Sequence, residues 1–191
     1  MNIGLYFGSF NPIHHGHLII AQHLLNETDL EQVWMVISPQ NPFKPQKQLL
    51  NEYHRLHLVH LAIGDNSRIK ASDIEFGLPK PSYTIDTVTY LKEKYPQHNF
   101  SIIMGSDGLQ NLDKWKNASK LMQENPFYVY RRPGFEVIHH PVKKLIIVDA
   151  PLLEISATHI RELIRQQKSI RYLVPDAVIE ELKRNNYYKN D

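Results

Sequence analysis

The chain has 191 residues, with 22 Lys and Arg balanced against 20 Asp and Glu, which leaves a formal charge of +2. It contains no cysteine, so disulfides, a thiolate nucleophile and a cysteine zinc site are excluded. The balanced charge predicts no nucleic-acid partner, and no apolar run is long enough to cross a membrane. The first ten residues, MNIGLYFGSF, lack the basic and apolar regions of a signal peptide, so we expect a cytoplasmic protein.

Apolar residues recur at strand spacing and then at helix spacing along the first half of the chain. A loop with three prolines and no hydrophobic period interrupts this alternation at residues 38–50. The predicted elements are, in order, a strand at 2–7, a helix at 16–26, a strand at 32–37, a helix at 52–63 and a strand at 68–74.

The second half of the chain repeats the alternation after a Gly-Leu-Pro-Lys-Pro break. Its predicted elements are a helix at 82–94, a strand at 100–104, a helical stretch at 106–123, strands at 127–131 and 144–148, and helices at 156–166 and 175–184. The last five residues, YYKND, are expected to fray, as chain ends do when no contact holds them.

This alternation predicts an α/β fold, doubly wound, with a mostly parallel sheet and helices on both faces. We expect a single domain over residues 1–191, with a C-terminal helical part at about 156–186. Ligands of such sheets bind beyond the carboxyl ends of the strands. The segments that follow predicted strands, 8–17, 38–44 and 105–107, are therefore the places to look for a site.

The first such segment reads Gly-Ser-Phe-Asn-Pro-Ile-His-His-Gly-His from Gly8 to His17. Gly8 and Ser9 are small enough for the backbone to approach a ligand, and His14 and His17 lie where the predicted helix begins. The unpaired N–H groups of a helix start attract anions, and imidazoles beside them can donate to phosphate oxygens. The P-loop and GxGxxG motifs are both absent. Ordinary packing of the two histidines, or a zinc site, remain alternatives.

A second segment, Ile-Ser-Ala-Thr-His-Ile-Arg at residues 155–161, opens the first of the two C-terminal helices. Ser156 suits the N-cap of that helix, and capping alone is one interpretation. However, Ser156, Thr158 and Arg161 together offer two hydroxyls and a guanidinium fork that fits phosphate oxygens. Two helix starts that carry polar donors would clamp a polyphosphate from opposite sides.

The pair GSFNPIHHGH and ISATHIR resembles the two signatures of the nucleotidyltransferase superfamily with the HxGH motif, which has a Rossmann-like fold. Further segments resemble those of bacterial nicotinate-nucleotide adenylyltransferases. They are PSYTIDT at 81–87, Gly105-Ser106-Asp107 followed by Trp115, RRPG at 131–134 and the Pro/Lys loop ending at Lys44. The resemblance covers residues 2–186, nearly the whole chain.

The resemblance implies an enzyme that joins nicotinate mononucleotide to ATP, giving deamido-NAD and pyrophosphate. The mononucleotide phosphate would attack the α-phosphorus of ATP directly, without a covalent enzyme intermediate, and Mg²⁺ held mainly by the ATP phosphates would neutralise the leaving group. The implied catalytic residues are His14, His17 and Arg161, with His17 at the reacting centre. The implied ATP-binding residues are Gly8, Ser9, Phe10, His14, His17, Gly105, Asp107, Ser156, Thr158 and Arg161.

The resemblance also implies where nicotinate mononucleotide binds. Trp115 would stack on the pyridine ring, and Tyr83 and Thr84 at a helix start would meet the nicotinate carboxylate. Lys44 would approach the mononucleotide phosphate. The alternatives are core packing for Trp115, helix capping for Tyr83 and Thr84, and a solvated loop lysine for Lys44.

Three positions depart from the family pattern. Asn11 stands where Asp is commoner, Ala157 replaces a second Ser, and Lys116 follows Trp115 where some members have an aromatic residue. The last departure puts the ring-binding set in doubt rather than the reaction class.

Other functions compete with this interpretation. Within the superfamily, nicotinamide mononucleotide or phosphopantetheine would be the acceptor instead; outside it, the chain would be an inactive nucleotide-binding regulator or a metal-dependent hydrolase. His14 and the PSYTIDT segment argue against a phosphopantetheine enzyme. A homo-oligomer is left open.

Overall fold

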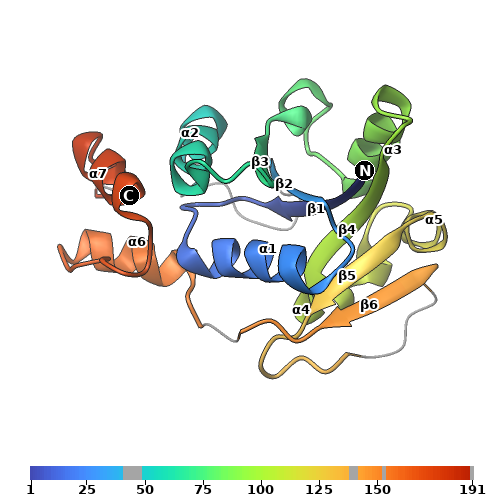
Figure 1. Cartoon of the computed structure of the whole chain (residues 1–191). Coiled ribbons are helices and arrows are strands. Elements are labelled where there is room, and N and C mark those ends of the chain that lie inside the picture. The colour runs from blue at the N-terminus through green and yellow to red at the C-terminus, as the bar shows by residue number, and fades with distance from the viewer. Residues whose placement is uncertain (41–48, 138–141, 152–153, 190–191) are drawn as a thin grey trace.

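The computed structural model describes residues 1–40, 49–137, 142–151 and 154–189. Its strands are β1 (Asn2–Gly8), β2 (Gln32–Ile37), β3 (Ile69–Ser72), β4 (Asn99–Gly105), β5 (Pro126–Tyr130) and β6 (Lys144–Val148). Its helices are α1 (His15–Glu27), α2 (Glu52–Ile63), α3 (Thr84–Lys94), α4 (Ser106–Leu109), α5 (Ala118–Glu124), α6 (Ala157–Arg165) and α7 (Asp176–Arg184), with 3-10 turns at Ile74–Gly77 and Leu112–Lys114. Figure 1 shows the arrangement.

The six strands form one parallel sheet in the order β3-β2-β1-β4-β5-β6. The chain starts in the middle at β1, builds outward to β3, and then crosses over to β4 on the other side of β1. The strand order therefore reverses between β1 and β4, and the connections leave these two strands in opposite directions. Such a reversal opens a crevice at the carboxyl ends of the two strands. The predicted doubly wound α/β fold is confirmed.

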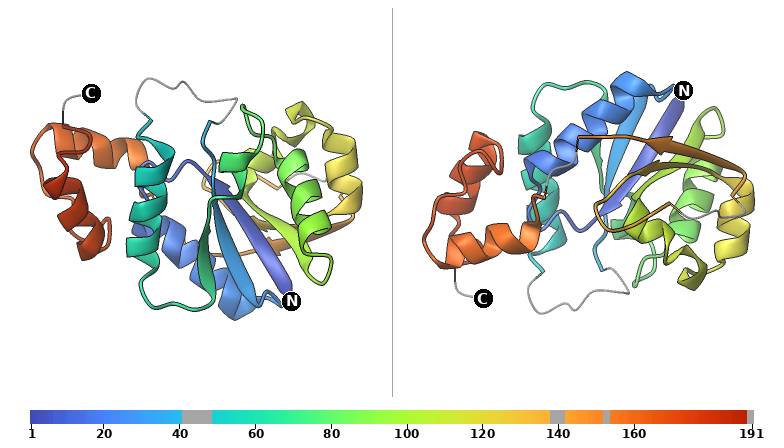
Figure 2. Two further views of the ribbon diagram at one scale, coloured as in Figure 1. Left: turned by 90° about the horizontal axis from the view of Figure 1, so that it is seen from above. Right: turned by 90° about the horizontal axis from the view of Figure 1, so that it is seen from below.

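Successive residues of the buried strands point to opposite faces of the sheet, so the core has two parts. Tyr6 of β1 packs in a cluster with residues of α1 and α2, whereas its neighbour Leu5 packs in a cluster with residues of α3 and α5. The strands read as continuous apolar runs because helices cover both faces. The two views of Figure 2 show these helical layers on either side of the sheet.

The helices α6 and α7 lie together at one end of the molecule, beside α2 and the start of α1 (Figures 1 and 2). Val178 and Leu182 of α7 belong to the same core cluster as Leu58 of α2. The backbone N–H of His15 donates to the carbonyl of Leu173, just before α7, at 2.9 Å. The segment that contains α6 and α7 is thus attached to the start of α1, where the first motif lies.

The predicted elements differ from the structure in three places. The helical stretch expected at 106–123 is broken into α4, a 3-10 turn and α5, and Asn117 before α5 adopts a left-handed conformation (φ 51°). The strand expected to reach residue 74 ends at Ser72, because the chain turns into a 3-10 helix. The prediction that the tail frays is wrong for Tyr188, which is only 5% exposed.

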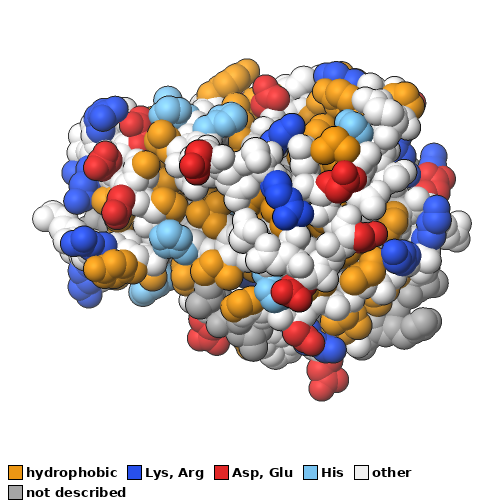
Figure 3. All heavy atoms as spheres, in the orientation of Figure 1, with side chains coloured by type: hydrophobic (Ala, Val, Ile, Leu, Met, Phe, Trp, Pro, Cys, Tyr) orange, Lys and Arg blue, Asp and Glu red, His pale blue; other side chains and the backbone are white. Residues whose placement is uncertain are grey.

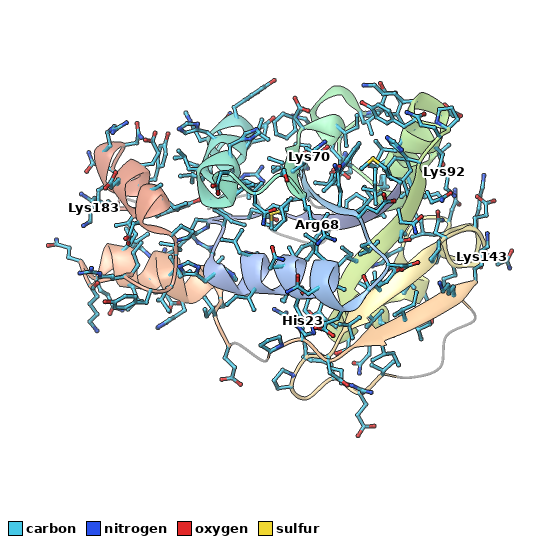
Figure 4. The ribbon with its side chains drawn as sticks, viewed as in Figure 1. His23, Arg68, Lys70, Lys92, Lys143 and Lys183 are labelled. Atoms are coloured by element: carbon cyan, nitrogen blue, oxygen red, sulfur yellow. The ribbon has the colours of Figure 1, made fainter. Side chains whose placement is uncertain are left out.

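Arg68 links the helical layer to the sheet at the far end from the crevice. Its guanidinium donates to the carbonyls of Leu25, Leu30 and Glu31, which closes the end of α1 against β2 (Figure 4). On the face drawn in Figure 3, Lys and Arg side chains are interspersed with Asp and Glu. No helix within the described ranges is long and apolar enough to cross a membrane.

Candidate active site

A cavity of about 890 Å³ lies at the carboxyl ends of β1 and β4, where the strand order reverses. Its volume falls in the range of small-molecule sites. The cavity brings together all but one of the residues singled out from the sequence: Gly8, Ser9, Phe10, His14, His17, Tyr83, Thr84, Gly105, Asp107, Trp115, Ser156, Thr158 and Arg161. The remaining residue, Lys44, lies outside the described residues.

The loop after β1 is shaped by the contact between Gly8 and Phe10. Phe10 adopts a left-handed conformation (φ 45°), which is strained for a residue with a side chain, and its ring is buried. A Cβ atom at Gly8 would come within 2.8 Å of that ring, so only glycine fits. The strain is offset by burial of the ring, which also packs edge-on against His17 with 5.0 Å between ring centroids.

A buried arginine supports this loop from below. Arg55 of α2 is fully buried, and its guanidinium donates to the carbonyls of Ser9 (2.6 Å), Ser38 (2.9 Å) and Leu50 (2.6 Å). These carbonyls belong to the segment after β1, the segment after β2 and the approach to α2. One charged side chain therefore joins the loop after β1 to both ends of the connection between β2 and α2. Burial lowers the pKa of this guanidinium.

The two histidines of the first motif stack on one another at the start of α1, with 3.7 Å between ring centroids and 27° between ring planes. Gly16 leaves room for this arrangement, because a Cβ atom there would lie 3.0 Å from Nδ1 of His14 and would crowd the ring. The backbone N–H of His14 donates to Nδ1 of His17 at 3.3 Å. A neutral imidazole whose Nδ1 accepts a hydrogen bond carries its proton on Nε2. The hydrogen-bond donor of the His17 ring is therefore Nε2.

His14 is 5% exposed, and this burial, together with the charges of Arg132 and His15, lowers its pKa to about 4. The imidazole is therefore neutral at physiological pH in the absence of a ligand. A bound polyphosphate would favour the protonated form, since an opposite charge nearby raises the pKa of a histidine. His14 thus offers a polar but uncharged group that an anion can polarise.

The second motif faces the first across the cavity. Ser156 is the N-cap of α6, and its hydroxyl accepts from the backbone N–H of His159 at 3.1 Å, as predicted. Arg161 reaches over to the first motif and donates from Nη1 to the carbonyl of Asn11 at 2.7 Å, and from Nη2 to the hydroxyl of Thr158 at 3.3 Å. A guanidinium from near the end of the chain therefore sits beside the loop that follows the first strand.

The loop after β4 forms another wall of the cavity. A Cβ atom at Gly105 would crowd the Asp107 carboxylate, so a larger residue there would push that side chain aside. Oδ2 of Asp107 accepts from Nη1 of Arg132 at 3.0 Å, and the backbone N–H of Arg132 donates to the hydroxyl of Ser106 at 2.9 Å. Arg132 lines the cavity but was not among the predicted site residues, although the RRPG segment that contains it stands out in the sequence.

The start of α3 lies on a further wall of the cavity. Tyr83 is the N-cap residue and Thr84 the first helical residue, and no side chain caps this end within the described part of the chain. Trp115 lines the cavity nearby. Lys116 forms an ion pair with Asp86 at 2.7 Å and places its ammonium 4.7 Å from the centroid of the Tyr83 ring. The lysine that departs from the family pattern therefore helps to hold the helix start.

Glu75 is a further cavity residue that sequence reasoning missed. It is 2% exposed, and Oε1 accepts from the hydroxyl of Thr87 at 2.8 Å. Burial raises the pKa of this carboxyl, against the opposing effect of hydrogen bonds from Ser82, Thr87 and Ser38. An acidic residue after a short strand gives no pattern in sequence that distinguishes it from a solvated one.

Among the residues that the structure describes, no three His, Asp or Glu side chains gather in a way that could hold a metal ion. The zinc alternative for His14 and His17 therefore gains no support from this part of the chain. The carboxylate of Asp107 is engaged by Arg132. The donor set of the cavity, mostly imidazole, guanidinium and hydroxyl groups, suits phosphate oxygens better than it suits a metal ion.

Residues 5–163 match the family described as Cytidylyltransferase-like. This stretch contains the second half of β1, the other five strands of the sheet and both sequence motifs up to Arg161. The parallel sheet with a polar cavity at its reversal point is thus that of a nucleotidyltransferase, and the chain belongs to the cytidylyltransferase-like family.

The chain is 52% identical over 191 residues to a probable nicotinate-nucleotide adenylyltransferase of Cytophaga hutchinsonii, covering 100% of both chains. It is 49% identical to a protein of the same name from Flavobacterium psychrophilum, over 99% of this chain and 100% of that one. Its fold is similar to that of Plasmodium falciparum nicotinic acid mononucleotide adenylyltransferase complexed with NaAD, with a TM-score of 0.85 at 24% identity, covering 100% of this chain and 98% of that one. Within its family the chain is therefore grouped with the nicotinate-nucleotide adenylyltransferases, as the motifs predicted.

Proposed function

We propose that this chain is a nicotinate-nucleotide adenylyltransferase that joins nicotinate mononucleotide to ATP and releases deamido-NAD and pyrophosphate. The observation that carries the proposal is the single cavity shared by the two motifs and by the Tyr83-Thr84 and Trp115 walls. The two motifs form the phosphate end of this cavity, and Tyr83, Thr84 and Trp115 form its ring end. A reaction between two nucleotides needs both ends in one space. The names of the full-length relatives support the same substrates.

The catalytic work in this proposal is positioning and charge stabilisation. The mononucleotide phosphate forms a new bond to the α-phosphorus of ATP, and the bond from that phosphorus to the β-phosphate oxygen breaks. His17 donates from Nε2 to the reacting phosphate, and His14 beside it gains basicity as the anion enters. Arg161, with Ser156 and Thr158, holds the β- and γ-phosphates and stabilises the pyrophosphate that leaves.

Other predicted residues contact the phosphates and the adenosine of ATP. The backbone from Gly8 to Phe10 approaches the phosphates, and Asp107 after Gly105 accepts from the ribose hydroxyls of adenosine. Arg132 orients the Asp107 carboxylate through their 3.0 Å contact.

The ring of nicotinate would stack on Trp115, and its carboxylate would meet the open backbone amides at the start of α3, next to Tyr83 and Thr84. Lys44 remains a candidate for the mononucleotide phosphate.

In this proposal Mg²⁺ binds together with ATP. The described residues supply no carboxylate cluster, so the phosphates and water would provide most of its ligands. When bound, the ion neutralises charge on the leaving pyrophosphate.

A substrate panel tests the proposal. Purified protein receives Mg²⁺ and ATP with nicotinate mononucleotide, nicotinamide mononucleotide or phosphopantetheine, and pyrophosphate release is measured. We expect the highest kcat/KM with nicotinate mononucleotide, and little release when CTP replaces ATP. Faster release with phosphopantetheine would identify a different adenylyltransferase, and no release with any acceptor despite ATP binding would identify an inactive nucleotide-binding protein.

A further inference from the structure

Asn11 lines the cavity, and it is the residue at which four distant parts of the chain meet. It lies between β1 and α1 and is 8% exposed. Its side-chain Oδ1 accepts from the hydroxyl of Tyr188 at 2.6 Å and from the backbone N–H of Leu50 at 3.1 Å. Its backbone carbonyl accepts from Nη1 of Arg161 at 2.7 Å. Both motifs, the approach to α2 and the C-terminal tail are thus joined at a single residue.

Tyr188 reaches this position because the tail folds back after α7. The backbone N–H of Tyr187 donates to the carbonyl of Leu182 at 3.1 Å, and Tyr188 follows in a left-handed conformation (φ 63°). The ring of Tyr188 then joins the core cluster of α1, α2 and α7. A non-glycine residue holds such a conformation only where its surroundings fix it, and here buried packing and a buried hydrogen bond do so.

The hydrogen bond between Tyr188 and Asn11 orients the backbone of Asn11 rather than a bound ligand. An asparagine whose Oδ1 receives two donors has its amide group fixed, and the backbone of the same residue then has little freedom. The carbonyl of Asn11 is the partner of the Arg161 guanidinium, which lines the cavity. Movement of that carbonyl would therefore disturb the position of the guanidinium.

We propose that Tyr188 is a positioning residue of the active site: its hydroxyl holds Asn11 so that the Asn11 carbonyl aims Arg161 at the triphosphate. The inference rests on the proposed function, since it assumes that Arg161 binds ATP phosphates. It makes the C-terminal tail, which lies 177 residues from Asn11 along the chain, part of the ATP-binding machinery.

Tyr188→Phe removes a single oxygen atom and keeps the packed ring. Because a buried acceptor then loses a partner and Arg161 loses its alignment, we expect the dissociation constant and KM for Mg·ATP to rise ~5–20-fold. The KM for nicotinate mononucleotide should stay within about twofold, since the ring end is untouched. Tyr187→Phe is the matched control, because it removes an exposed neighbouring hydroxyl that is bonded to His54, and it should leave all constants unchanged.

A double-mutant cycle decides whether the effect runs through Asn11. Tyr188→Phe should add nothing to Asn11→Ala, since the acceptor has already gone, whereas Asn11→Asp retains the acceptor and should preserve most of the ATP affinity. Thermal unfolding of each variant shows whether it folds. Additive effects of Tyr188→Phe and Asn11→Ala, or a Tyr188→Phe variant with wild-type ATP affinity, would overturn the inference.

The affinity for α,β-methylene-ATP, measured by calorimetry without turnover, separates this inference from the proposed function. If wild-type protein binds the analogue but releases no pyrophosphate with any acceptor, the proposed function fails. The effect of Tyr188→Phe on the affinity for the analogue can still be measured in that case. If turnover is normal and Tyr188→Phe binds the analogue as wild type does, the inference alone fails.

Discussion

The two ends of the cavity are built differently. At the phosphate end, His14, Phe10 and Asn11 of the first motif are buried, and each is held by ring contacts or by hydrogen bonds from distant parts of the chain, whereas Ser156 and Thr158 of the second motif are exposed. At the ring end, Tyr83, Thr84 and Trp115 are partly exposed. Lys116 and Asp86, each 43% exposed, form the ion pair that holds the start of α3.

This difference in burial indicates that the fold positions the phosphate-binding residues more firmly than the ring-binding residues. Buried contacts fix geometry before a ligand arrives, which is what charge stabilisation of a reacting phosphate requires. An exposed ion pair is worth little, so the Lys116–Asp86 contact holds its helix start only weakly. We infer that the phosphate end determines the rate, whereas the ring end determines which acceptor is used.

The largest effect is expected from the phosphate end. His17→Ala should lower turnover by ~10²–10³, or about 3–4 kcal/mol, because one donor to the transition state is lost. Pyrophosphate release at saturating substrates measures this. Retention of more than a third of wild-type turnover would place the reacting phosphate away from His17.

The buried state of His14 should appear as a pH dependence of stability. Its pKa is about 4 in the folded chain, against 6.5 when exposed. Below pH 6.5 the unfolded chain therefore binds a proton that the folded chain does not, and stability falls as the pH drops toward 4. Between pH 7.5 and 4.5 the wild type should lose about 2–3 kcal/mol more unfolding free energy than His14→Gln.

Urea unfolding at a series of pH values measures the difference between these two proteins. Parallel curves for wild type and His14→Gln would show that His14 titrates as an exposed histidine does, and that the phosphate end is open to water.

Arg161→Ala should act mainly on ATP. Loss of a charge-assisted contact to the phosphates should raise the KM for ATP by ~10–100-fold, with a smaller effect on the KM of the acceptor. Steady-state kinetics with each substrate varied in turn separates the two. An unchanged KM for ATP with normal turnover would refute the assigned role.

The smallest effect is expected at the ring end. Trp115→Ala should raise the KM for nicotinate mononucleotide by ~5–50-fold, the size of a lost stacking contact, while the KM for ATP changes little. Trp115→Phe is the control, since it retains an aromatic face. If Trp115→Ala instead lowers stability and leaves both KM values unchanged, the indole is a packing residue.

The same contrast explains how much could be predicted from the sequence. β1, the loop after it and α1 form from consecutive residues, so Gly8, His14 and His17 could be placed together from local pattern. Ser156 could be placed as an N-cap for the same reason. These features were confirmed, as was the alternation that makes the sheet.

What the sequence did not reveal depends on contacts between distant segments. Arg55 sits in an ordinary helix, and its burial follows from the two loops that cross above it. Tyr188 belongs to a polar tail whose composition predicts fraying, yet Asn11 holds it. Glu75 and Arg132 are charged residues that only the assembled cavity distinguishes from surface charge.

The most direct test of the account is a crystal structure of the protein with Mg²⁺, α,β-methylene-ATP and nicotinate mononucleotide. We predict that the triphosphate lies between the imidazoles of His14 and His17 on one side and the Arg161 guanidinium on the other, with the acceptor ring against Trp115. A triphosphate bound elsewhere, without contact to either motif, would contradict the account.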